Sequence, residues 1–453
     1  MANRRGTRAR LTTAGVGAVV GLVVVGVVVL GVVVLGVVTV TWGPNGYAAS
    51  TARVKSTTVS TTGPVLGSPP TARPTTLPPP TMFPIVNPVS PFPPLLDCPS
   101  PEQAVSRWPL RSRVAQLLAI GADGRSMSAS KRLVAEQHVG GLVVRSAPGS
   151  AAQLAAGIGA LRLVEGALPT TFSVDEEGGR VQVLRSATGS FPSARRLAGN
   201  PPEKVRALAG AHYRKVRALG INMILGPVLD VTAENSGVIG DRSFGADPVL
   251  VGRLGSATAA GVRDAGMVPA VKHFPGHGGA TGDSHSGRVS TLPIDVLRQR
   301  DEIPFRMALA DGPVAVMVGH LEVPGLSGET PSTLSFATIT NELRNSLGFD
   351  GLIITDSLSM GAVTTRWKAP AAGVEAIAAG ADVALFVTIS ERDAIGVIDA
   401  LEYAVSVGRI SEGQLNHSVV RVVRSKNLNP CNIDPAALLR DTATAEAAYQ
   451  ASR

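Results

Sequence analysis

Eight short apolar runs alternate with helical segments from residue 113 onward, and this alternation restricts the fold more than any other feature of the chain. The apolar runs are Val114–Gly121, Gly141–Arg145, Thr170–Asp175, Ile221–Asp230, Val268–Phe274, Val314–His320, Gly351–Asp356 and Ala381–Val387. Unbroken apolar runs are typical of strands that are buried on both faces of a parallel sheet. The segments between them, such as Pro202–Gly220, have helical spacing and end in glycine. Eight strand–helix units predict a closed (β/α)8 barrel of the TIM type, and a doubly wound open sheet is the alternative.

The N-terminus combines a basic segment, 1–10, with an uncharged apolar run, 11–41. The apolar run is long enough to cross a bilayer as a helix, and it is longer than the apolar region of a secretory signal peptide. Basic residues that precede such a helix remain in the cytoplasm. We therefore expect a transmembrane signal anchor with the rest of the chain outside the cytoplasm. Cleavage as a signal peptide near Ala48 or Ala49, which gives a secreted protein, is the alternative.

Residues 42–97 form a linker rich in proline, serine and threonine, and we expect it to be a disordered stalk. Such a composition cannot bury enough apolar surface to offset the entropy lost on ordering. The formal net charge of +8 is concentrated here and upstream: residues 1–97 contain seven basic residues and one acidic residue, and their +6 leaves +2 for the remainder. A nearly neutral body lacks the basic surface that nucleic-acid binding needs, so we expect no nucleic-acid partner.

Two cysteines, Cys98 and Cys431, lie at the two ends of the region that is predicted to form the barrel. Outside the cytoplasm we expect a disulfide between them, and closing so long a loop contributes about 4–5 kcal/mol in the chain-entropy model. A lipid-bearing Cys98 is the alternative, but Asp97 stands where such a site needs a small residue. We therefore place the folded domain at 98–431 and a C-terminal tail at 432–453.

Polar residues follow directly after several of the predicted strands. They are Asp175 with Glu176 and Glu177, Asp230, Lys272 with His273, His320, and Asp356. The carboxyl ends of barrel strands converge on one mouth, where barrel enzymes carry out catalysis. Each position also has a structural interpretation: Asp356 is placed to cap the next helix, some of the three consecutive acids must be solvated, and Arg242 is able to pair with one of them.

The run Lys272–Gly287, KHFPGHGGATGDSHSG, holds three histidines in a segment too rich in glycine to form a helix. His273 and His277 have the spacing of helical metal ligands, but the glycines and the absence of an HExxH glutamate disfavour a metal site. Asp283 and His285 lie two residues apart, so on an extended loop their side chains point the same way. The carboxylate then holds Nδ1–H of the imidazole and favours its protonated form, which suits acid–base catalysis near neutral pH. An ordinary Asp-Ser-His turn is the alternative.

Five segments together resemble glycoside hydrolase family 3, and most of all its single-domain β-N-acetylglucosaminidase branch. The segments are Val174–Gln182, Leu225–Val231, Ile239–Pro248, Lys272–Gly287 and Gly348–Val363. They stand in the family's order over most of residues 105–425. Larger relatives add a second α/β domain, and too few residues follow the predicted barrel here for such a domain, which supports the single-domain branch.

The resemblance implies a retaining mechanism in which Asp356 attacks the anomeric carbon, His285 is the acid/base and Asp283 is its partner. It implies sugar-binding roles for Asp175, Arg242, Lys272 and His273. In such a loop, glycine would let the acid/base pair swing over the bound sugar and away again.

Two positions depart from the family's pattern. Val183 stands where an arginine is usual, with Arg185 two residues further on, and Ser357 follows Asp356 where many relatives have a second aspartate.

The expected activity is therefore the release of terminal β-linked N-acetylglucosamine, with peptidoglycan fragments as the substrate. We expect the enzyme to act as a monomer, anchored through its N-terminal helix or secreted, with no cofactor and no metal. The chain also lacks a P-loop, a GxGxxG fingerprint and a GxSxG elbow. A non-catalytic barrel that binds wall sugars, a β-glucosidase of the same family, and a metal-dependent hydrolase are the alternatives.

Overall fold

The chain divides into two units, Met1–Met82 and Phe83–Arg453. The computed structural model describes residues 98–234, 237–441 and 443, and upstream of them only the backbone of four short strands. In the first unit these strands form two antiparallel pairs: β1 (Leu22–Val29) with β2 (Val32–Thr39), and β3 (Thr41–Trp42) with β4 (Ala48–Ala49).

The apolar run 11–41 differs from its prediction. The sequence predicts a single membrane-spanning helix, whereas the structure has strands β1 and β2 within this run. Branched valine side chains favour extended backbone, and an unbroken apolar run has no period that separates helix from strand. No helix in the described parts of the chain is both long enough and apolar enough to span a bilayer. The predicted basic tail, 1–10, lies outside the described residues, as does the linker, 42–97, apart from Trp42 and β4.

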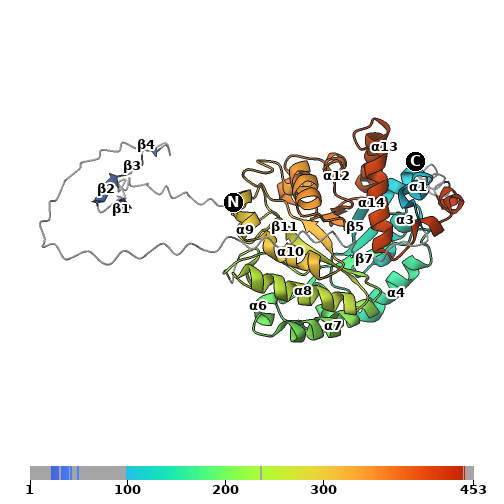
Figure 1. The fold of residues 1–453 in the computed structure, drawn as a ribbon, viewed down its shortest axis with the longest axis horizontal. Helices are drawn as coiled ribbons and strands as arrows, with labels where there is room; N and C mark the ends of the chain where they lie inside the picture. Colours follow the sequence, from blue (N-terminus) through green and yellow to red (C-terminus); the bar gives the residue numbers. More distant parts are fainter. Residues whose placement is uncertain are drawn as a thin grey trace, which may run out of the picture. The chain divides into compact units, whose positions relative to one another are not determined.

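The second unit is built around a parallel barrel, with helices around its outside (Figure 1). The barrel strands are β5 (Leu118–Ala122), β6 (Gly141–Val144), β7 (Thr171–Val174), β10 (Met223–Ile224), β11 (Val268–Phe274), β12 (Ala315–Val318), β13 (Ile353–Thr355) and β14 (Ala384–Phe386). They pair in the order β13-β12-β11-β10-β7-β6-β5-β14, and a parallel bridge between Ile354 and Val383 joins the two end strands. The sheet therefore closes on itself, which favours the predicted barrel over an open sheet.

Helices follow the strands around the barrel. The longer ones are α4 (Ala151–Arg162), α7 (Pro202–Ala218), α8 (Pro248–Asp264), α10 (Glu302–Asp311), α12 (Ala369–Ala378), α13 (Glu391–Ser406), α14 (Glu412–Ser425) and the π-helix η4 (Ala337–Ser346). The shorter ones are α1 (Pro101–Ser106), α2 (Leu110–Ala115), η1 (Met127–Ser130), α3 (Lys131–Ala135), α5 (Arg185–Thr188), α6 (Ala194–Leu197), η2 (Gly240–Arg242), α9 (Ile294–Gln299), η3 (Ser332–Leu334), α11 (Gly361–Thr364) and η5 (Pro430–Asn432).

Local sequence signals explain where several helices begin and end. Ser390 and Ser411 accept hydrogen bonds from amides of the first turns of α13 and α14, which satisfies groups that have no partner within the helix. Helix α7 begins with Pro202, whose missing amide hydrogen costs nothing at this position. The chain leaves α7 at Gly220, which has a φ of 97° that side chains with a Cβ rarely adopt.

Each of the eight predicted runs overlaps one barrel strand, so the strand count is confirmed. The boundary of the first strand is wrong. The prediction begins at Val114, but Val114 and Ala115 belong to α2 and the strand β5 begins at Leu118. Both residues are buried, and a short apolar run does not show by itself where a buried helix ends and a strand begins.

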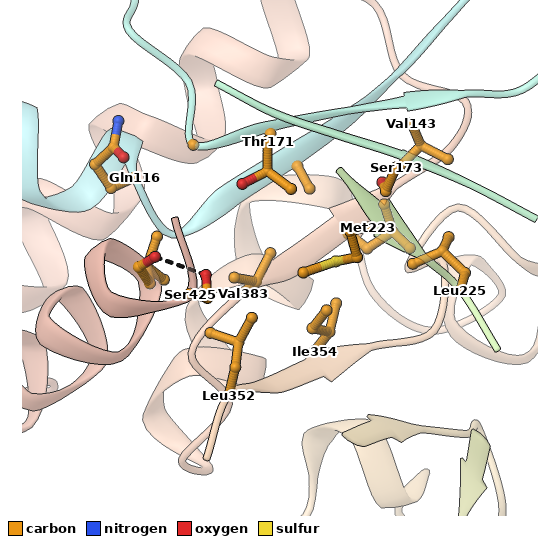
Figure 2. Close-up of a pocket in the computed structure, with 15 residues that line it drawn as sticks. Gln116, Val143, Thr171, Ser173, Met223, Leu225, Leu352, Ile354, Val383 and Ser425 are labelled. Carbon is orange, nitrogen blue, oxygen red and sulfur yellow. Dashed lines mark hydrogen bonds between the residues drawn. The ribbon is translucent and has the colours of Figure 1, made fainter. Parts of the chain in front are cut away.

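The barrel interior holds a cavity that is lined mainly by residues of the barrel strands (Figure 2). Alternate residues of the strands line it, among them Ser173, Met223 and Leu385, and Gln116 and Ser425 face it near the amino-terminal strand ends. None of its lining residues is an acid, a base or a histidine. The cavity is therefore a gap in the apolar core rather than a place for acid–base chemistry.

The predicted disulfide between Cys98 and Cys431 is confirmed, with 5.5 Å between the two Cα atoms. The bond joins residues 333 positions apart, and Cys98 is buried beside the start of α1. It therefore ties the beginning of the barrel domain to the segment that follows α14.

Candidate active site

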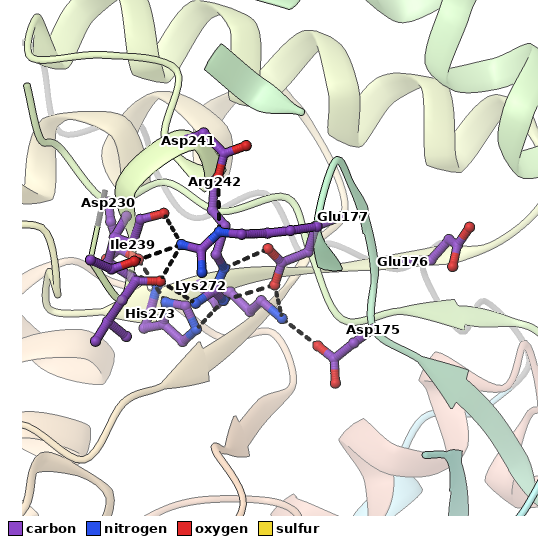
Figure 3. A network of polar contacts seen from close by, with 12 residues as sticks. Asp175, Glu176, Glu177, Asp230, Ile239, Asp241, Arg242, Lys272 and His273 are labelled. Carbon is purple, nitrogen blue, oxygen red and sulfur yellow. Dashed lines mark hydrogen bonds and ion pairs between the residues drawn. The ribbon is translucent and has the colours of Figure 1, made fainter. Parts of the chain in front are cut away.

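The predicted polar residues lie at the carboxyl ends of the strands. Asp175 follows β7, Lys272 and His273 belong to the end of β11, and Asp356 follows β13. The Nζ atom of Lys272 is 2.5 Å from Oδ1 of Asp175, although the two residues are 97 positions apart (Figure 3). The closed barrel thus brings side chains from separate strands to one mouth, as the sequence predicts.

A buried ion cluster forms the floor of this mouth. Lys272 Nζ lies 2.7 Å from Oε1 of Glu177, and both side chains are almost wholly buried. The guanidinium of Arg242 donates two hydrogen bonds to the same carboxylate, from Nε at 2.7 Å and from Nη2 at 2.8 Å. One carboxylate therefore holds two cations, one from β11 and one from η2, and the paired geometry restricts the orientation of Arg242.

These contacts fix the charges of the cluster. Burial opposes ionisation of Glu177, but Lys272 and Arg242 outweigh it and lower the pKa of Glu177 far below its usual range. Burial likewise opposes a charged Lys272, and the neighbouring carboxylates of Asp175 and Glu177 raise its pKa above 10.5. Glu177, Lys272 and Arg242 are therefore all charged at neutral pH.

A second set of contacts determines the tautomer of His273. Arg242 Nη2 lies 3.3 Å from Nε2 of His273, and a guanidinium only donates hydrogen bonds, so Nε2 is the acceptor. The proton then sits on Nδ1, which donates to Oδ2 of Asp230 at 2.6 Å. Asp230 is fully buried and also accepts from the backbone amide of His277 at 2.7 Å. Asp230 thus orients the ring of His273 and the start of the following loop together.

An irregularity in β11 explains how two consecutive residues serve the same site. In a regular strand, Lys272 and His273 would point to opposite faces of the sheet. The register between β11 and β12 shifts between Val271 and Phe274, where the pairing resumes with Val318. Both intervening side chains therefore reach the polar cluster at the mouth (Figure 3).

Asp356 has an ionised carboxylate in a half-buried position. Burial raises its pKa, while the rings of His320 and His273, the backbone amide of Ser357 and Lys272 lower it, and the result is a pKa of about 2. The amide of Ser357 donates to Oδ1 at 2.7 Å, and the backbone amide of Asp356 donates to Val318 at 2.8 Å. The carboxylate is therefore charged at neutral pH and held in place by its own backbone.

His320 holds the backbone next to Asp356 through a hydrogen bond to Ser357. Its Nε2 lies 2.8 Å from the carbonyl oxygen of Ser357, which only accepts, so Nε2 carries the proton. Its Nδ1 is 2.8 Å from the hydroxyl of Thr333. Burial lowers the pKa of His320, which keeps the ring neutral and fits a structural role next to Asp356.

The Asp283–His285 contact forms within a turn, in which the amide of Ser286 donates to the carbonyl oxygen of Asp283 at 3.0 Å, and not on the extended loop that was expected. His285 Nδ1 is 2.7 Å from Oδ1 of Asp283, and the backbone amide of His285 donates to the same oxygen at 3.0 Å. This amide, followed by the imidazole, lowers the pKa of Asp283. The imidazole is 66% exposed and its Nε2 is directed away from the carboxylate, so Nε2 is the atom available for proton exchange.

The loop that carries this pair lies at the same end of the barrel as Asp356. The carbonyl oxygen of His285 accepts a hydrogen bond from the amide of Gly361 at 3.1 Å, and that of Ser284 accepts from Ala362 at 3.0 Å. Gly361 is five positions after Asp356 in the chain. The structure therefore brings the two predicted catalytic groups to one mouth.

The histidines of this loop do not gather around a common point. His277 is buried, its ring lies edge-on to that of His273 with 5.7 Å between the ring centroids, and its Nε2 is 3.5 Å from the hydroxyl of Ser284. Within the described residues, no group of three or more His, Cys, Asp or Glu side chains is arranged to hold a metal ion.

The three consecutive acids differ from the expectation that some are solvated. Glu176 and Glu177 are both buried, and only Asp175 is partly exposed. Glu176 is directed away from Lys272 and accepts from His212 of α7 at 3.0 Å and from the amide of Leu184 at 2.8 Å (Figure 3). The short hairpin of β8 (Glu176–Gly178) and β9 (Val181–Gln182) explains this split, because successive side chains of a strand alternate.

Sequence reasoning missed Glu177 and Asp230 as members of the site. The one sequence signal for Glu177 and Asp230 was their position among the polar residues that follow predicted strands. Arg185, the substitute for the arginine expected two positions earlier, donates to the carbonyl of Gly179. It thus supports the hairpin instead of entering the Lys272 cluster.

Comparisons with known proteins agree with this arrangement. A family model described as glycosyl hydrolase family 3 N terminal domain matches residues 109–425. Beta-hexosaminidase LpqI of Mycobacterium tuberculosis is 42% identical over 376 residues, which cover 80% of this chain and 93% of that protein. The solved structure of M tuberculosis LpqI superposes with a TM-score of 0.67 and 41% identity, over 73% of this chain and 97% of that one. A family 3 β-N-acetylglucosaminidase from Paenibacillus sp. gives a TM-score of 0.66 and 34% identity, over 74% and 63%.

Proposed function

The chain belongs to glycoside hydrolase family 3, and from this membership we propose that it is a retaining exo-β-N-acetylglucosaminidase. The observation that carries the proposal is that an ionised carboxylate, Asp356, lies at the same barrel mouth as a loop that carries the Asp283–His285 pair. The relatives that are named β-hexosaminidase or β-N-acetylglucosaminidase support the substrate class.

In the first step, a carboxylate oxygen of Asp356 attacks the anomeric carbon of the terminal sugar, and the bond from that carbon to the leaving oxygen breaks. His285, protonated at Nε2, donates this proton to the leaving oxygen, so the aglycone departs as a neutral alcohol. Asp283 accepts the hydrogen bond from Nδ1 throughout and stabilises the charged ring. The product of this step is a glycosyl ester of Asp356.

In the second step, neutral His285 accepts a proton from water at Nε2 while the water oxygen attacks the anomeric carbon. The ester bond breaks, Asp356 leaves as a carboxylate, and the sugar retains its β configuration after two displacements. A pKa of about 2 suits Asp356 to both roles, because it is ionised before attack and is a good leaving group afterwards.

The ion cluster supplies the groups that hold the sugar. Asp175 is 36% exposed, so its carboxylate is placed to accept hydrogen bonds from sugar hydroxyls, while Lys272 holds it from below. Arg242 and His273 line the same mouth, fixed by Glu177 and Asp230. A rigid, fully paired cluster of this kind orients a substrate without reorganising when it binds.

Peptidoglycan fragments outside the cytoplasm are the proposed source of the sugar. The Cys98–Cys431 disulfide supports an oxidising compartment, and the basic segment followed by an apolar run at the N-terminus supports export. Release of N-acetylglucosamine from a purified disaccharide–peptide tests this substrate. Release only from an aryl glycoside would restrict the proposal to the sugar and exclude the peptidoglycan source.

Trapping of the covalent intermediate tests the mechanism. The protein is incubated with a fluorinated N-acetylglucosamine analogue that forms the glycosyl ester quickly and hydrolyses slowly, and the labelled peptide is identified by mass spectrometry. The proposal requires the added mass to lie on Asp356. A label on another acid overturns the nucleophile assignment, and an absence of turnover with any N-acetylglucosaminide favours a sugar-binding barrel. Faster turnover of the matching glucoside favours a β-glucosidase.

A further inference from the structure

The loop that carries His285 is held by the start of a short helix. The amide groups of Gly361 and Ala362 are the first two of α11, and amides at a helix start have no acceptor within the helix. They donate to the carbonyl oxygens of His285, at 3.1 Å, and Ser284, at 3.0 Å. The loop backbone therefore supplies the acceptors that α11 lacks.

Side-chain packing contributes little to holding the tip of this loop. The imidazole of His285 is 66% exposed and the side chain of Asp283 is 45% exposed. The side chain of Ser284 is buried, but its hydroxyl reaches His277 only at 3.5 Å. The two main-chain hydrogen bonds to α11 are accordingly the closest polar contacts between the loop tip and the segment that follows Asp356.

This approach requires glycine at position 361. A Cβ atom on Gly361 would stand 2.7 Å from the carbonyl oxygen of His285, and 2.8 Å and 2.9 Å from the carbonyl carbon and oxygen of Ser286. All three are backbone atoms, which cannot turn aside as a side chain does. Gly287, in the same loop, has no atom within 4 Å of the corresponding point, and neither glycine has a left-handed φ.

We propose that Gly361 is a positioning residue for the acid/base loop: its missing side chain lets α11 dock the backbone of Ser284–Ser286, which sets His285 relative to Asp356. The proposal rests on the function proposed above for these two groups. Because α11 begins five residues after Asp356, one short segment carries both the nucleophile and the dock for the proton donor. Any shift of the dock changes the distance between the two reacting groups.

The kinetic test compares Gly361→Ala with the matched control Gly287→Ala, using aryl N-acetylglucosaminides with good and poor leaving groups. A misplaced proton donor is expected to lower kcat by roughly 10–100-fold for poor leaving groups and by only a few-fold for good ones, with little change in KM. Gly287→Ala is expected to stay within about twofold of the parent, because nothing occupies the space around it. Equal kinetics for Gly361→Ala and the parent overturn the proposal.

A double variant separates positioning from general damage. If Gly361 acts through the imidazole, then Gly361→Ala adds no further loss of kcat in a His285→Ala background. Losses that multiply in the double variant show that the glycine acts on something else and overturn the proposal.

Hydrogen exchange tests the docking without using activity. In the parent protein, the amides of Gly361 and Ala362 are expected to exchange slowly although they start a helix, and in Gly361→Ala they are expected to exchange at least tenfold faster. Rapid exchange in the parent overturns the proposal, even if the variant does not fold. If the parent protein hydrolyses no N-acetylglucosaminide, the function proposed above fails, but the exchange result still decides whether α11 docks the loop.

Discussion

Lys272 and Glu177 form an ion pair of 2.7 Å in which both side chains are almost fully removed from solvent. Glu177 also holds Arg242, so two buried cations share this one carboxylate, and Asp175 contacts only Lys272. Removing one partner of a buried pair costs more than the pair itself contributes, because the remaining charge stays desolvated and unpaired. Glu177 is therefore the residue of the cluster that contacts both cations, and its own side chain is only 5% exposed.

Glu177→Gln is expected to lower the free energy of unfolding by about 3–5 kcal/mol, because two cations lose their common counter-ion while the shape of the side chain is kept. It is also expected to raise KM, since Lys272 and Arg242 lose their fixed positions. Denaturant unfolding and steady-state kinetics measure the two effects. Glu375→Gln is the control: Glu375 pairs with Arg409 at 2.7 Å on the surface, and its loss is expected to cost at most about 1 kcal/mol. Similar costs for both variants would show that the buried cluster adds nothing.

Asp356→Ala is expected to reduce kcat on an aryl β-N-acetylglucosaminide by roughly 10³-fold or more, because no covalent intermediate forms without the carboxylate. Substrate binding is expected to persist, since the Lys272 cluster remains intact. Single-turnover kinetics together with binding of a product sugar distinguish these effects. Activity close to that of the parent would end the assignment of Asp356 as the nucleophile.

His285→Ala is expected to harm substrates with poor leaving groups far more than substrates with activated ones, because only the former need a proton at the departing oxygen. A difference of roughly 10²-fold between the two classes is expected, measured as kcat/KM over a series of phenols. Asp283→Asn is expected to show the same trend in weaker form, since it leaves the imidazole in place but removes the charge that stabilises it. Losses that do not depend on the leaving group would contradict the acid role.

The barrel was predictable because its strands are buried on both faces and so appear as continuous apolar runs between helices. The N-terminal run was not, because valine, glycine and leucine without charges are compatible with a helix or a strand, and the structure has the strands β1 and β2 there. The predicted start of β5 was wrong for a similar reason, because Val114 is a buried residue of the preceding helix, α2. Apolar patterning thus identifies burial more reliably than it identifies backbone conformation.

The site was predictable where position along a strand determines direction. Asp175 and Asp356 directly follow strands, and Asp283 and His285 are two residues apart, so local geometry places them. Lys272 and His273 lie within β11, and their shared direction depends on the register shift there, which strand position alone does not predict. The roles of Glu176 and Glu177 depend instead on partners far away in sequence, which are His212 on α7 and Arg242 at the end of η2. No local pattern shows which of two adjacent acids binds which partner.

Removal of the disulfide by Cys98→Ser together with Cys431→Ser is expected to lower the free energy of unfolding by about 5 kcal/mol, since the bond closes a loop of 333 residues in the unfolded chain. Activity at low temperature is expected to remain, because the bond lies beside α1 and η5 and not at the polar mouth. Unfolding in denaturant with and without a reducing agent provides the measurement on the parent protein. An unchanged midpoint after full reduction would contradict this expectation.

The carboxyl group of Asp301 makes the stability of the fold depend on pH. Asp301 is fully buried and packs against Gly276. A Cβ atom added to Gly276 would stand 2.4 Å from the Cβ atom of Asp301. Burial raises its pKa from 3.8 to about 7, and Asp230 adds to the rise, while Arg300, whose Nε lies 3.5 Å away, opposes it. The folded protein therefore binds this proton more tightly than the unfolded chain does.

The sign follows from this difference in proton affinity: the stabilisation is complete below about pH 4 and is lost as the pH rises to about 7. At about 1.4 kcal/mol per pKa unit, the loss is on the order of 4 kcal/mol. Asp301→Asn keeps the shape without the charge, so it is expected to be more stable than the parent at pH 8 and to lack this part of the slope. Glu302, whose pKa burial also raises to about 7, contributes equally to both proteins, so the difference between their unfolding curves at pH 5 and pH 8 isolates Asp301. Asp295→Asn, at a side chain that is 83% exposed, is the control and is expected to follow the parent. If the free energy of unfolding depends on pH in the same way for the parent and for Asp301→Asn, then Asp301 is ionised in the folded protein and the expectation is wrong.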